Sequence, residues 1–480
     1  MTFGVGRISG ITHRKMQRRS FLAGAAASTL LLKSVFAQTE QAAADQQPNK
    51  QDLTALLKTL LVSESQRLNE FAVDVYSTCV LGKIRAADPP LAHAWLVPGG
   101  GYYAQWLWDT MFVADLLSLL PGQVQLLRGV FQNFWDFQQR WDAAKPLPMH
   151  GMVANYMAPF DAPGWRDGKQ WRDFPAYSQA PLLAWGMERV YLRNGDRELL
   201  RVGLPALEAF HEWYWRERDI TNVGLIGVGD YSGDLQHARY ETYDREVDLD
   251  GLRMIPHPGR AAGVDNGAWY GNLAIPANTA YLLLSEQALE RMANSLGDRS
   301  MAMRRHARYQ KGVQAMQQRM WDQESGCFVA VDVLTGKQTG SPTIGGFIPL
   351  MARVPTLPQA RTMAAALDTS AWNTSLPIPT VSAMNREYKP DEFWRGDVWP
   401  APNYQVATGL ALYGYRDTAA RIADATVANA LKVGISEHYN SASGAPLGVA
   451  GLGMSATILT MILDRLTSQR YRMYVRESRG

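Results

Sequence analysis

Segments with helical periodicity follow one another in pairs along this 480-residue chain, and this pattern is compatible with few folds. Apolar residues return at the spacing of an α-helix through most of the sequence, and 46% of the residues are hydrophobic, which is ample for a large core. Long stretches separate the helix pairs, whereas the helices of a bundle are usually joined by short connections. The predicted helices cover residues 52–62, 64–80, 104–120, 123–142, 177–193, 199–217, 274–297, 300–321, 357–368, 401–414, 417–433 and 453–467.

The long loops recur about once per helix pair and are rich in glycine, proline and aromatic residues. Loops of this length usually carry function. If the helix pairs closed into a ring, these loops would gather at one end of it and form one pocket. The predicted loops are 94–104, 144–175, 218–273, 322–346, 370–400 and 434–452.

The organisation of the chain is predicted to be simple. A polar, glutamine-rich linker covers residues 38–52, and one catalytic domain covers 53–470, because no composition break or short repeat divides that stretch. Residues 471–480 form a tail.

The first 37 residues differ from the rest and resemble a twin-arginine signal peptide. Arg18 and Arg19 precede a modest apolar run, and small residues at 35–37 offer a cleavage site. An ordinary secretory signal with a chance arginine pair and a true membrane anchor are the alternatives, although the run is too short to span a membrane comfortably. Met16 is the predicted start of translation. The segment has no acidic residue and six basic ones: Arg7, Arg14, Lys15, Arg18, Arg19 and Lys33.

The charge of the chain gives no indication of nucleic-acid binding. Without the six basic residues of the signal, 42 basic residues remain against 45 acidic ones, and no basic stripe remains that would suggest binding to nucleic acid.

We expect a periplasmic or secreted protein, exported by the twin-arginine machinery, with no stable membrane span in its mature form. Cys79 and Cys327 are predicted to be two buried thiols. The oligomeric state is left open.

Two loop segments join aromatic residues to a carboxylate, the combination that carbohydrate chemistry requires, since carboxylates move protons at the glycosidic bond and aromatic faces receive the apolar side of a sugar. The segment GYYAQWLWDT places Trp106, Trp108 and Asp109 at a helix start, where an ordinary core and a helix-terminal aspartate are the alternative interpretation. The segment GRAAGVDNGAWYGN places Asp265 in a glycine-rich turn, where a capping role is the alternative.

Two further segments lie near the C-terminus. GISEHYNSASGAPLG places Glu437 among turn-forming residues, in which glutamate is unusual. EFWRGDVWP combines residues that are costly to expose with residues that are costly to bury unpaired, which indicates a polar ligand. It contributes Trp394, Arg395, Asp397 and Trp399, followed by Asn403 and Tyr404 on the first turn of the next helix.

These segments resemble the six-hairpin glycosidases related to processing α-glucosidase I, in glycoside hydrolase family 63, and to mannosylglycerate hydrolase. The similarity covers roughly residues 90–468, and its specific part is the C-terminal pair of motifs, WRG-x-(V/I)W before an Asn-Tyr helix and E-x-Y-N-x-x-x-G. The matching residues are Trp394, Arg395, Gly396, Trp399, Asn403, Glu437, Tyr439, Asn440 and Gly444.

The resemblance implies an all-α fold, an (α/α)6 toroid, and exo-acting hydrolysis of a terminal α-glucoside or α-mannoside with inversion. It makes Asp265 the general acid and Glu437 the general base, with carboxyl groups roughly 6.5–9.5 Å apart across the sugar. No metal is needed for this mechanism, although a structural calcium held by loop carboxylates is left open. The implied substrate-binding residues are Trp106, Trp108, Asp109, Trp394, Arg395, Asp397, Trp399, Asn403 and Tyr439.

The chain also departs from the family pattern. Ala261 and Trp269 stand where relatives commonly carry an acidic residue and an arginine around the acid, and Asp397 stands where relatives carry a neutral residue. Asp397 could bind a sugar hydroxyl, pair with Arg395, or replace Asp265 as the acid.

Three other functions remain open. An α,α-trehalase is the nearest, because VPGGGYYAQWLWDTMF resembles a trehalase signature, although the second trehalase signature is absent. A toroid polysaccharide lyase or epimerase would use His438 or a tyrosine as proton carrier. A sugar-binding protein without catalysis is the third.

Overall fold

The computed structural model describes residues 66–144, 149–160, 177–229, 251–256, 269–339 and 342–466. These residues belong to one compact unit, Pro48–Gly480, and are described by themselves. The signal segment, the linker and the predicted helix at 52–62 lie outside the described residues.

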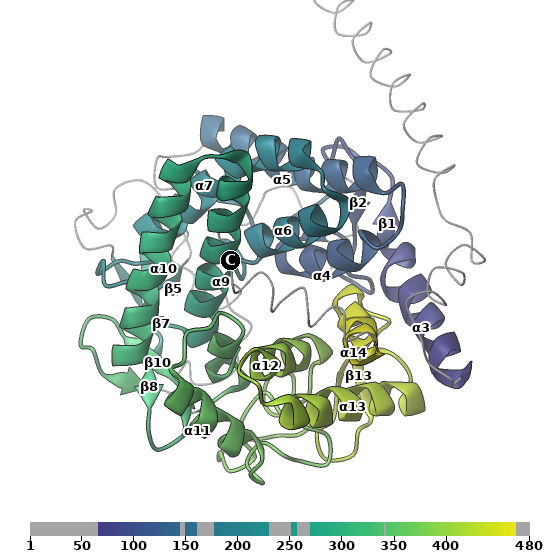
Figure 1. Ribbon diagram of the computed structural model, residues 1–480, viewed down its shortest axis with the longest axis vertical. Coiled ribbons are helices and arrows are strands. Elements are labelled where there is room, and N and C mark those ends of the chain that lie inside the picture. Colours follow the sequence, from purple (N-terminus) through teal and green to yellow (C-terminus); the bar gives the residue numbers. More distant parts are fainter. Residues whose placement is uncertain are drawn as a thin grey trace, which may run out of the picture. The chain divides into compact units, whose positions relative to one another are not determined.

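The helices form two concentric sets around a common centre, as Figure 1 shows. Neighbouring inner helices pack against each other around the ring, and the short 3-10 helices η5 (Ile344–Gly346) and η6 (Ile348–Leu350) take the inner place between α9 and α12. The predicted helix hairpins and the (α/α)6 toroid are confirmed. The inner set is α4 (Leu107–Leu117), α6 (Leu183–Asn194), α9 (Pro276–Leu296), α12 (Pro400–Leu412) and α14 (Thr457–Leu466). The outer set is α3 (Gln66–Cys79), α5 (Val124–Ala144), α7 (Arg197–Glu217), α10 (Arg299–Arg319), α11 (Leu357–Leu367) and α13 (Arg416–Val433).

The sequence of each helix explains its place in the ring. Every residue of α4 is buried, and its sequence, LWDTMFVADLL, has no polar face to turn toward water. In contrast, α13 buries one stripe at helical spacing and leaves its other residues partly or fully exposed. That stripe is Ala419, Ile422, Ala423, Thr426 and Ala430.

At one end of the ring, short turns lead from an inner helix to the next outer helix. Gly195 ends α6 in the left-handed conformation with φ 68°, and the Asp196 side chain then accepts hydrogen bonds from the first backbone N–H groups of α7. Gly297 and Asp298 repeat this device between α9 and α10.

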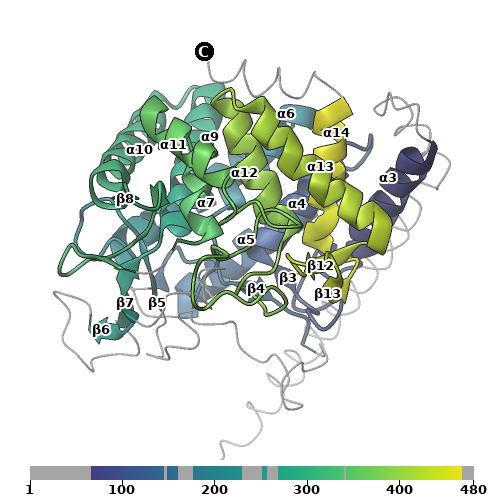
Figure 2. The ribbon, with the colours of Figure 1, turned by 90° about the horizontal axis from the view of Figure 1, so that it is seen from below.

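At the other end, each long loop leads from an outer helix to the N-terminus of an inner one, and Figure 2 shows many of the strands in these loops there, among them β3, β4, β5, β6, β7, β12 and β13. The predicted gathering of the loops is therefore confirmed for the described residues. The strands were not predicted, because most are too short to show an alternating pattern. They are β1 (Ile84–Arg85), β2 (Trp95–Leu96), β3 (Gln105–Trp106), β4 (Tyr156–Met157), β5 (Gly227–Gly229), β6 (Met254–Pro256), β7 (Trp269–Ala274), β8 (Trp321–Asp322), β9 (Cys327–Phe328), β10 (Ala330–Asp332), β11 (Gln338–Thr339), β12 (Ser436–Tyr439) and β13 (Pro446–Ala450).

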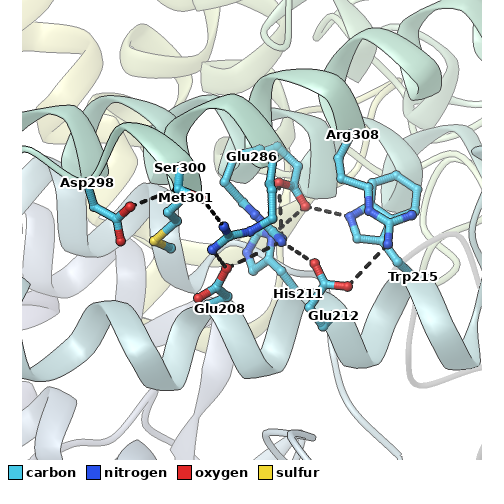
Figure 3. Close-up of polar contacts among 11 residues, drawn as sticks. Glu208, His211, Glu212, Trp215, Glu286, Asp298, Ser300, Met301 and Arg308 are labelled. Carbon is cyan, nitrogen blue, oxygen red and sulfur yellow. Dashed lines mark hydrogen bonds and ion pairs between the residues drawn. The ribbon is translucent and has the colours of Figure 1, made fainter.

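A buried charged cluster joins the outer helices α7 and α10 to α9 (Figure 3). Glu286 accepts a hydrogen bond from the Trp215 indole at 2.6 Å and lies 3.0 Å from His211 Nδ1. Arg305, only 1% exposed, lies 3.6 Å from Glu286 and also pairs with Glu212. The cluster therefore brings opposite charges together in the wall of the ring.

Both cysteines are free and buried, as predicted. Burial raises the pKa of Cys79 and of Cys327 to about 12, so both thiols are protonated at neutral pH. Among the described residues, we find no helix long and apolar enough to cross a membrane.

Candidate active site

Glu437 lies on β12 and is held at both carboxylate oxygens. The Tyr102 hydroxyl donates to Oε1 at 3.2 Å, and the Val449 backbone N–H on the neighbouring strand β13 donates to Oε2 at 2.9 Å. The side chain is 4% exposed. A carboxylate with donors on both oxygens has a fixed orientation, which a general base requires.

The close approach of β13 to Glu437 requires a glycine at position 448. Gly448 has φ 68°, and a Cβ added there would lie 2.5 Å from Glu437 Oε2 and 2.8 Å from His438 Nε2. Both atoms therefore lie beside the same point of the β13 backbone, and no other residue fits there without displacing them.

The segment EFWRGDVWP stacks two tryptophans on a histidine. The rings of Trp394 and Trp399 lie 4.2 Å apart with an interplanar angle of 11°, and Trp399 stacks on His438 at 4.9 Å and 7°. The turn between the tryptophans needs Gly396, with φ 143°, because a Cβ there would lie 2.6 Å from the Tyr388 ring. The stack brings the loop before α12 against β12.

Asp397 is fully buried at the centre of this arrangement. Its Oδ1 accepts from the Thr380 hydroxyl at 2.7 Å, and its Oδ2 accepts from the Trp399 indole N–H at 2.7 Å and lies 2.8 Å from His438 Nδ1. The suggested pair with Arg395 is wrong, because that guanidinium lies 3.3 Å from Glu387 and 3.4 Å from Glu392.

Asp109 is a third buried carboxyl group in the same region, in the first turn of α4. Burial raises the pKa of Asp109 to about 7, and the charge of Glu437 contributes to that rise. Burial also raises the pKa of Glu437, an effect that the Val449 N–H, His438 and Tyr102 oppose. The structure therefore brings Asp109, Asp397 and Glu437 together from three separate segments of the chain.

The two tryptophans before Asp109 have different environments. Trp106 packs edge-on against Tyr102 at 5.6 Å and against Tyr156 at 5.0 Å, in a small aromatic cluster beside the site. Trp108 belongs to the main core and contacts Phe112 at 6.1 Å. Both tryptophans are buried, and Trp106 is the one in contact with Tyr102, the partner of Glu437.

Two other predicted binding residues form contacts within the protein. Asn403 is fully buried and donates to Pro377 O at 2.7 Å and to the Thr426 hydroxyl at 2.9 Å. The Tyr439 hydroxyl donates to Gly434 O at 2.9 Å and accepts from the Ser436 N–H at 3.0 Å. These contacts hold the site loops in place.

Asp265 lies outside the described residues. The structure nevertheless fixes the two strands from which its segment departs, since β6 and β7 are antiparallel neighbours with Pro256 opposite Trp269. Strand β7 leads directly into α9, an inner helix whose N-terminus lies at the loop end of the ring.

Sequence reasoning did not assign Tyr102, Gly448 and Val449 to the site. Tyr102 follows a run of three glycines, a signal of close backbone approach that could have drawn attention to it. Val449 contributes its backbone N–H, so its side chain gives no sign of this role in the sequence. Within the described part of the chain, no group of three or more His, Cys, Asp or Glu side chains is arranged to hold a metal ion.

Known proteins resemble this chain in sequence. Residues 102–456 match the family described as the mannosylglycerate hydrolase MGH1-like glycoside hydrolase domain. The mannosylglycerate hydrolase of Thermus thermophilus is 26% identical over 408 residues, which cover 76% of this chain and 95% of that protein. The periplasmic trehalase of Salmonella paratyphi C is 23% identical, over 69% of this chain and 59% of that protein.

A solved structure shares the fold. The crystal structure of a GH63 mannosylglycerate hydrolase from Thermus thermophilus, in complex with Tris and D-glycerate, matches with a TM-score of 0.66 at 21% identity and covers 82% of this chain and 99% of that chain. Because the family match covers most of the ring and includes Tyr102, Asp109, Asp397 and Glu437, the chain belongs to the mannosylglycerate hydrolase MGH1-like glycoside hydrolases.

Proposed function

We propose that this glycoside hydrolase is an inverting, exo-acting α-glycosidase in which Glu437 is the general base and Asp265 the general acid. The observation that carries the proposal is the environment of Glu437, a buried carboxylate with donors on both oxygens beside two other carboxyl groups. Such a group can orient a water molecule and accept its proton.

Inversion requires space for that water between the two carboxyl groups, so we expect Asp265 and Glu437 to lie roughly 6.5–9.5 Å apart when substrate is bound. Asp265 must be protonated at working pH, and an apolar or aromatic surround would keep it so. Trp269, which begins β7, is the described aromatic residue nearest to Asp265 in the sequence, four residues later.

Asp109 and Trp106 are proposed to bind the terminal sugar. The Asp109 carboxyl group can accept a hydrogen bond from a sugar hydroxyl, and Trp106 with Tyr102 and Tyr156 offers aromatic faces for the apolar side of the ring. Asp397 is excluded from a catalytic role in this proposal, because its oxygens already face three partners inside the protein.

The proposed substrate is a small α-mannoside or α-glucoside such as mannosylglycerate, the compound that the named relatives hydrolyse. A trehalase is the second candidate, favoured by the trehalase relatives and by the segment VPGGGYYAQWLWDTMF, which carries Tyr102, Trp106 and Asp109. Incubation with mannosylglycerate, trehalose, nigerose and kojibiose, followed by ¹H NMR of the first product, tests the proposal.

We expect release of a monosaccharide with inverted anomeric configuration from at least one α-mannoside or α-glucoside. Hydrolysis of trehalose alone would make the protein a trehalase. Retention of configuration, or an unsaturated product absorbing in the ultraviolet, would reject the proposed mechanism.

We also propose that the mature protein works in the periplasm or outside the cell, after export of the folded chain by the twin-arginine machinery. The basis is the segment QRRSFLAGAAASTLLL and the absence of acidic residues before Gln38.

A further inference from the structure

The His438 ring is held on several sides by residues of the loop before α12. Asp397 Oδ2 lies 2.8 Å from Nδ1, Trp399 stacks on one face at 4.9 Å, and Phe393 packs edge-on at 5.5 Å. The side chain is only 6% exposed. A ring with these contacts has one orientation.

Both oxygens of Asp397 already accept hydrogen bonds from other side chains. An indole N–H can only donate, and the Thr380 hydroxyl, which itself accepts from the Gly396 N–H at 2.9 Å, donates to the other oxygen. Asp397 is therefore an acceptor at both oxygens, and His438 Nδ1 lies 2.8 Å from Oδ2 in an ion-pair contact rather than in a hydrogen bond. The other ring nitrogen, Nε2, lies on the Gly448 side, where Glu437 Oε2 also lies.

We propose that Asp397 and His438 form a positioning pair for Glu437, in which Asp397 fixes the imidazole and the imidazole keeps the Glu437 carboxylate in place and ready to accept a proton. This inference rests on the proposed role of Glu437 as general base. It assigns no bond-making step to either residue, since each acts through Glu437.

Burial and several neighbouring groups from separate elements determine the pKa of Glu437. Burial has the largest effect and raises this pKa, and Asp397 raises it further. The Val449 N–H, His438 on β12 and Tyr102 from the loop before β3 lower it. Asp109, in the first turn of α4, also interacts with it electrostatically. Removal of His438 takes away one of the groups that favour the ionised form, so the pKa of Glu437 must rise.

The test compares His438→Gln and Asp397→Asn with His211→Gln. His211 is a matched control, because it is also a buried histidine with Nδ1 beside a carboxylate, at 3.0 Å from Glu286, and it lies on α7 in the cluster of Figure 3. We expect kcat to fall roughly 10²-fold in each of the first two variants, with little change in KM, because a small misplacement of a catalytic group has an effect of that size. The double variant should lose no more than the worse single one.

The pH profile separates positioning from a merely structural role. The acidic limb of kcat/KM should move to higher pH in His438→Gln and stay in place in His211→Gln, even if both variants melt at lower temperature. Additive losses in the double variant, or an acidic limb that does not move, would overturn the proposal.

A direct titration keeps this test independent of the substrate. The Glu437 carboxyl signal, identified by ¹³C NMR from its loss in Glu437→Gln, should titrate at higher pH in His438→Gln than in the parent. The same titration in both proteins would reject the inference. Absence of hydrolysis by the parent would instead reject the proposed function and leave the NMR result to decide on the pair.

Discussion

Val398 and Tyr439 exchange two backbone hydrogen bonds, of 2.8 and 2.9 Å, and form a single antiparallel bridge between the loop before α12 and strand β12. The bridge aligns two motifs that lie far apart in the sequence. It places Asp397 and Trp399, on either side of Val398, against His438, the neighbour of Glu437. The candidate site is therefore assembled by backbone pairing as well as by side chains, and the following predictions test its parts.

Glu437→Gln should abolish hydrolysis, with kcat reduced by about 10² to 10⁴, because an amide cannot accept the proton of the attacking water. The melting temperature at pH 7 should be unchanged or higher, because burial raises the pKa of Glu437 and the neutral amide removes a buried charge. Steady-state kinetics and calorimetry measure both effects. Glu324→Gln, at an exposed position, is the control, and a Glu437 variant as active as this control would exclude Glu437 as the base.

Gly448→Ala should also inactivate the enzyme, because the added Cβ would displace Glu437 and His438. Gly336→Ala is a matched control, since Gly336 has φ 72°, close to the 68° of Gly448, but no heavy atom lies within 4 Å of its Cβ position. Both substitutions carry the backbone strain of the left-handed region, about 1–2 kcal/mol. If the two variants lose activity equally, strain rather than the contact with Glu437 explains the loss.

Asp109→Asn should stabilise the protein at pH 8 more than at pH 4. The pKa of Asp109 is raised to about 7 in the folded protein, above its ordinary value of 3.8, so ionisation opposes folding and stability falls as the pH rises between these values. The gain at pH 8 should be on the order of a few kcal/mol in the free energy of unfolding. Denaturant titrations at the two pH values measure it.

The control for this prediction is Asp417→Asn, an exposed aspartate in the first turn of α13. It should show no comparable gain at pH 8. Asp109→Asn should in addition weaken substrate binding or turnover, and a variant with parental kcat/KM would remove Asp109 from the site.

Arg305→Met should destabilise the ring by about 3–5 kcal/mol, because it leaves the Glu286 carboxyl group buried without this guanidinium. Arg304→Met, at the neighbouring exposed arginine that pairs with Glu208 at 2.7 Å, should leave the free energy of unfolding nearly unchanged, because solvent screens an exposed ion pair. Equal effects in urea unfolding would show that the cluster in Figure 3 contributes no more than a surface pair.

Replacement of Arg18 and Arg19 by lysines should keep the full-length protein in the cytoplasm, while the parent is recovered in the periplasm with its N-terminus at Gln38. Cell fractionation and N-terminal sequencing check this expectation. Export of the double-lysine variant at the parental level would favour an ordinary secretory signal.

The helical part of the fold could be predicted well from the sequence. The helix predicted at 417–433 is α13, Arg416–Val433, and that at 357–368 is α11, Leu357–Leu367, because their apolar stripes and caps are local signals. The inner partner between α9 and α12 was not predicted as 3-10 helices, because Ile344–Leu350 is a short apolar run with glycine and proline and without periodicity.

The site was predicted only in part, for a physical reason. Aromatic and acidic residues are visible in a sequence, so Asp109, Asp397 and Glu437 were found together with their tryptophans. Their partners were harder to find, because the Val449 N–H is a backbone group and Asp397 pairs with His438 only through a bridge between distant segments. Sequence patterns do not show which neighbours a buried carboxylate has.

Because the loops and the tight corners lie at opposite ends of the ring, enzymes with this fold can diversify at one end without changing the other. Since each long loop leaves and re-enters the helices at the same rim, insertions there can reshape substrate preference while the tight Gly-Asp corners at the opposite rim keep the scaffold intact. Evolution can thus change which glycosides are bound by altering these loops, because the length of a loop has only a small effect on the stability of the helices that it joins.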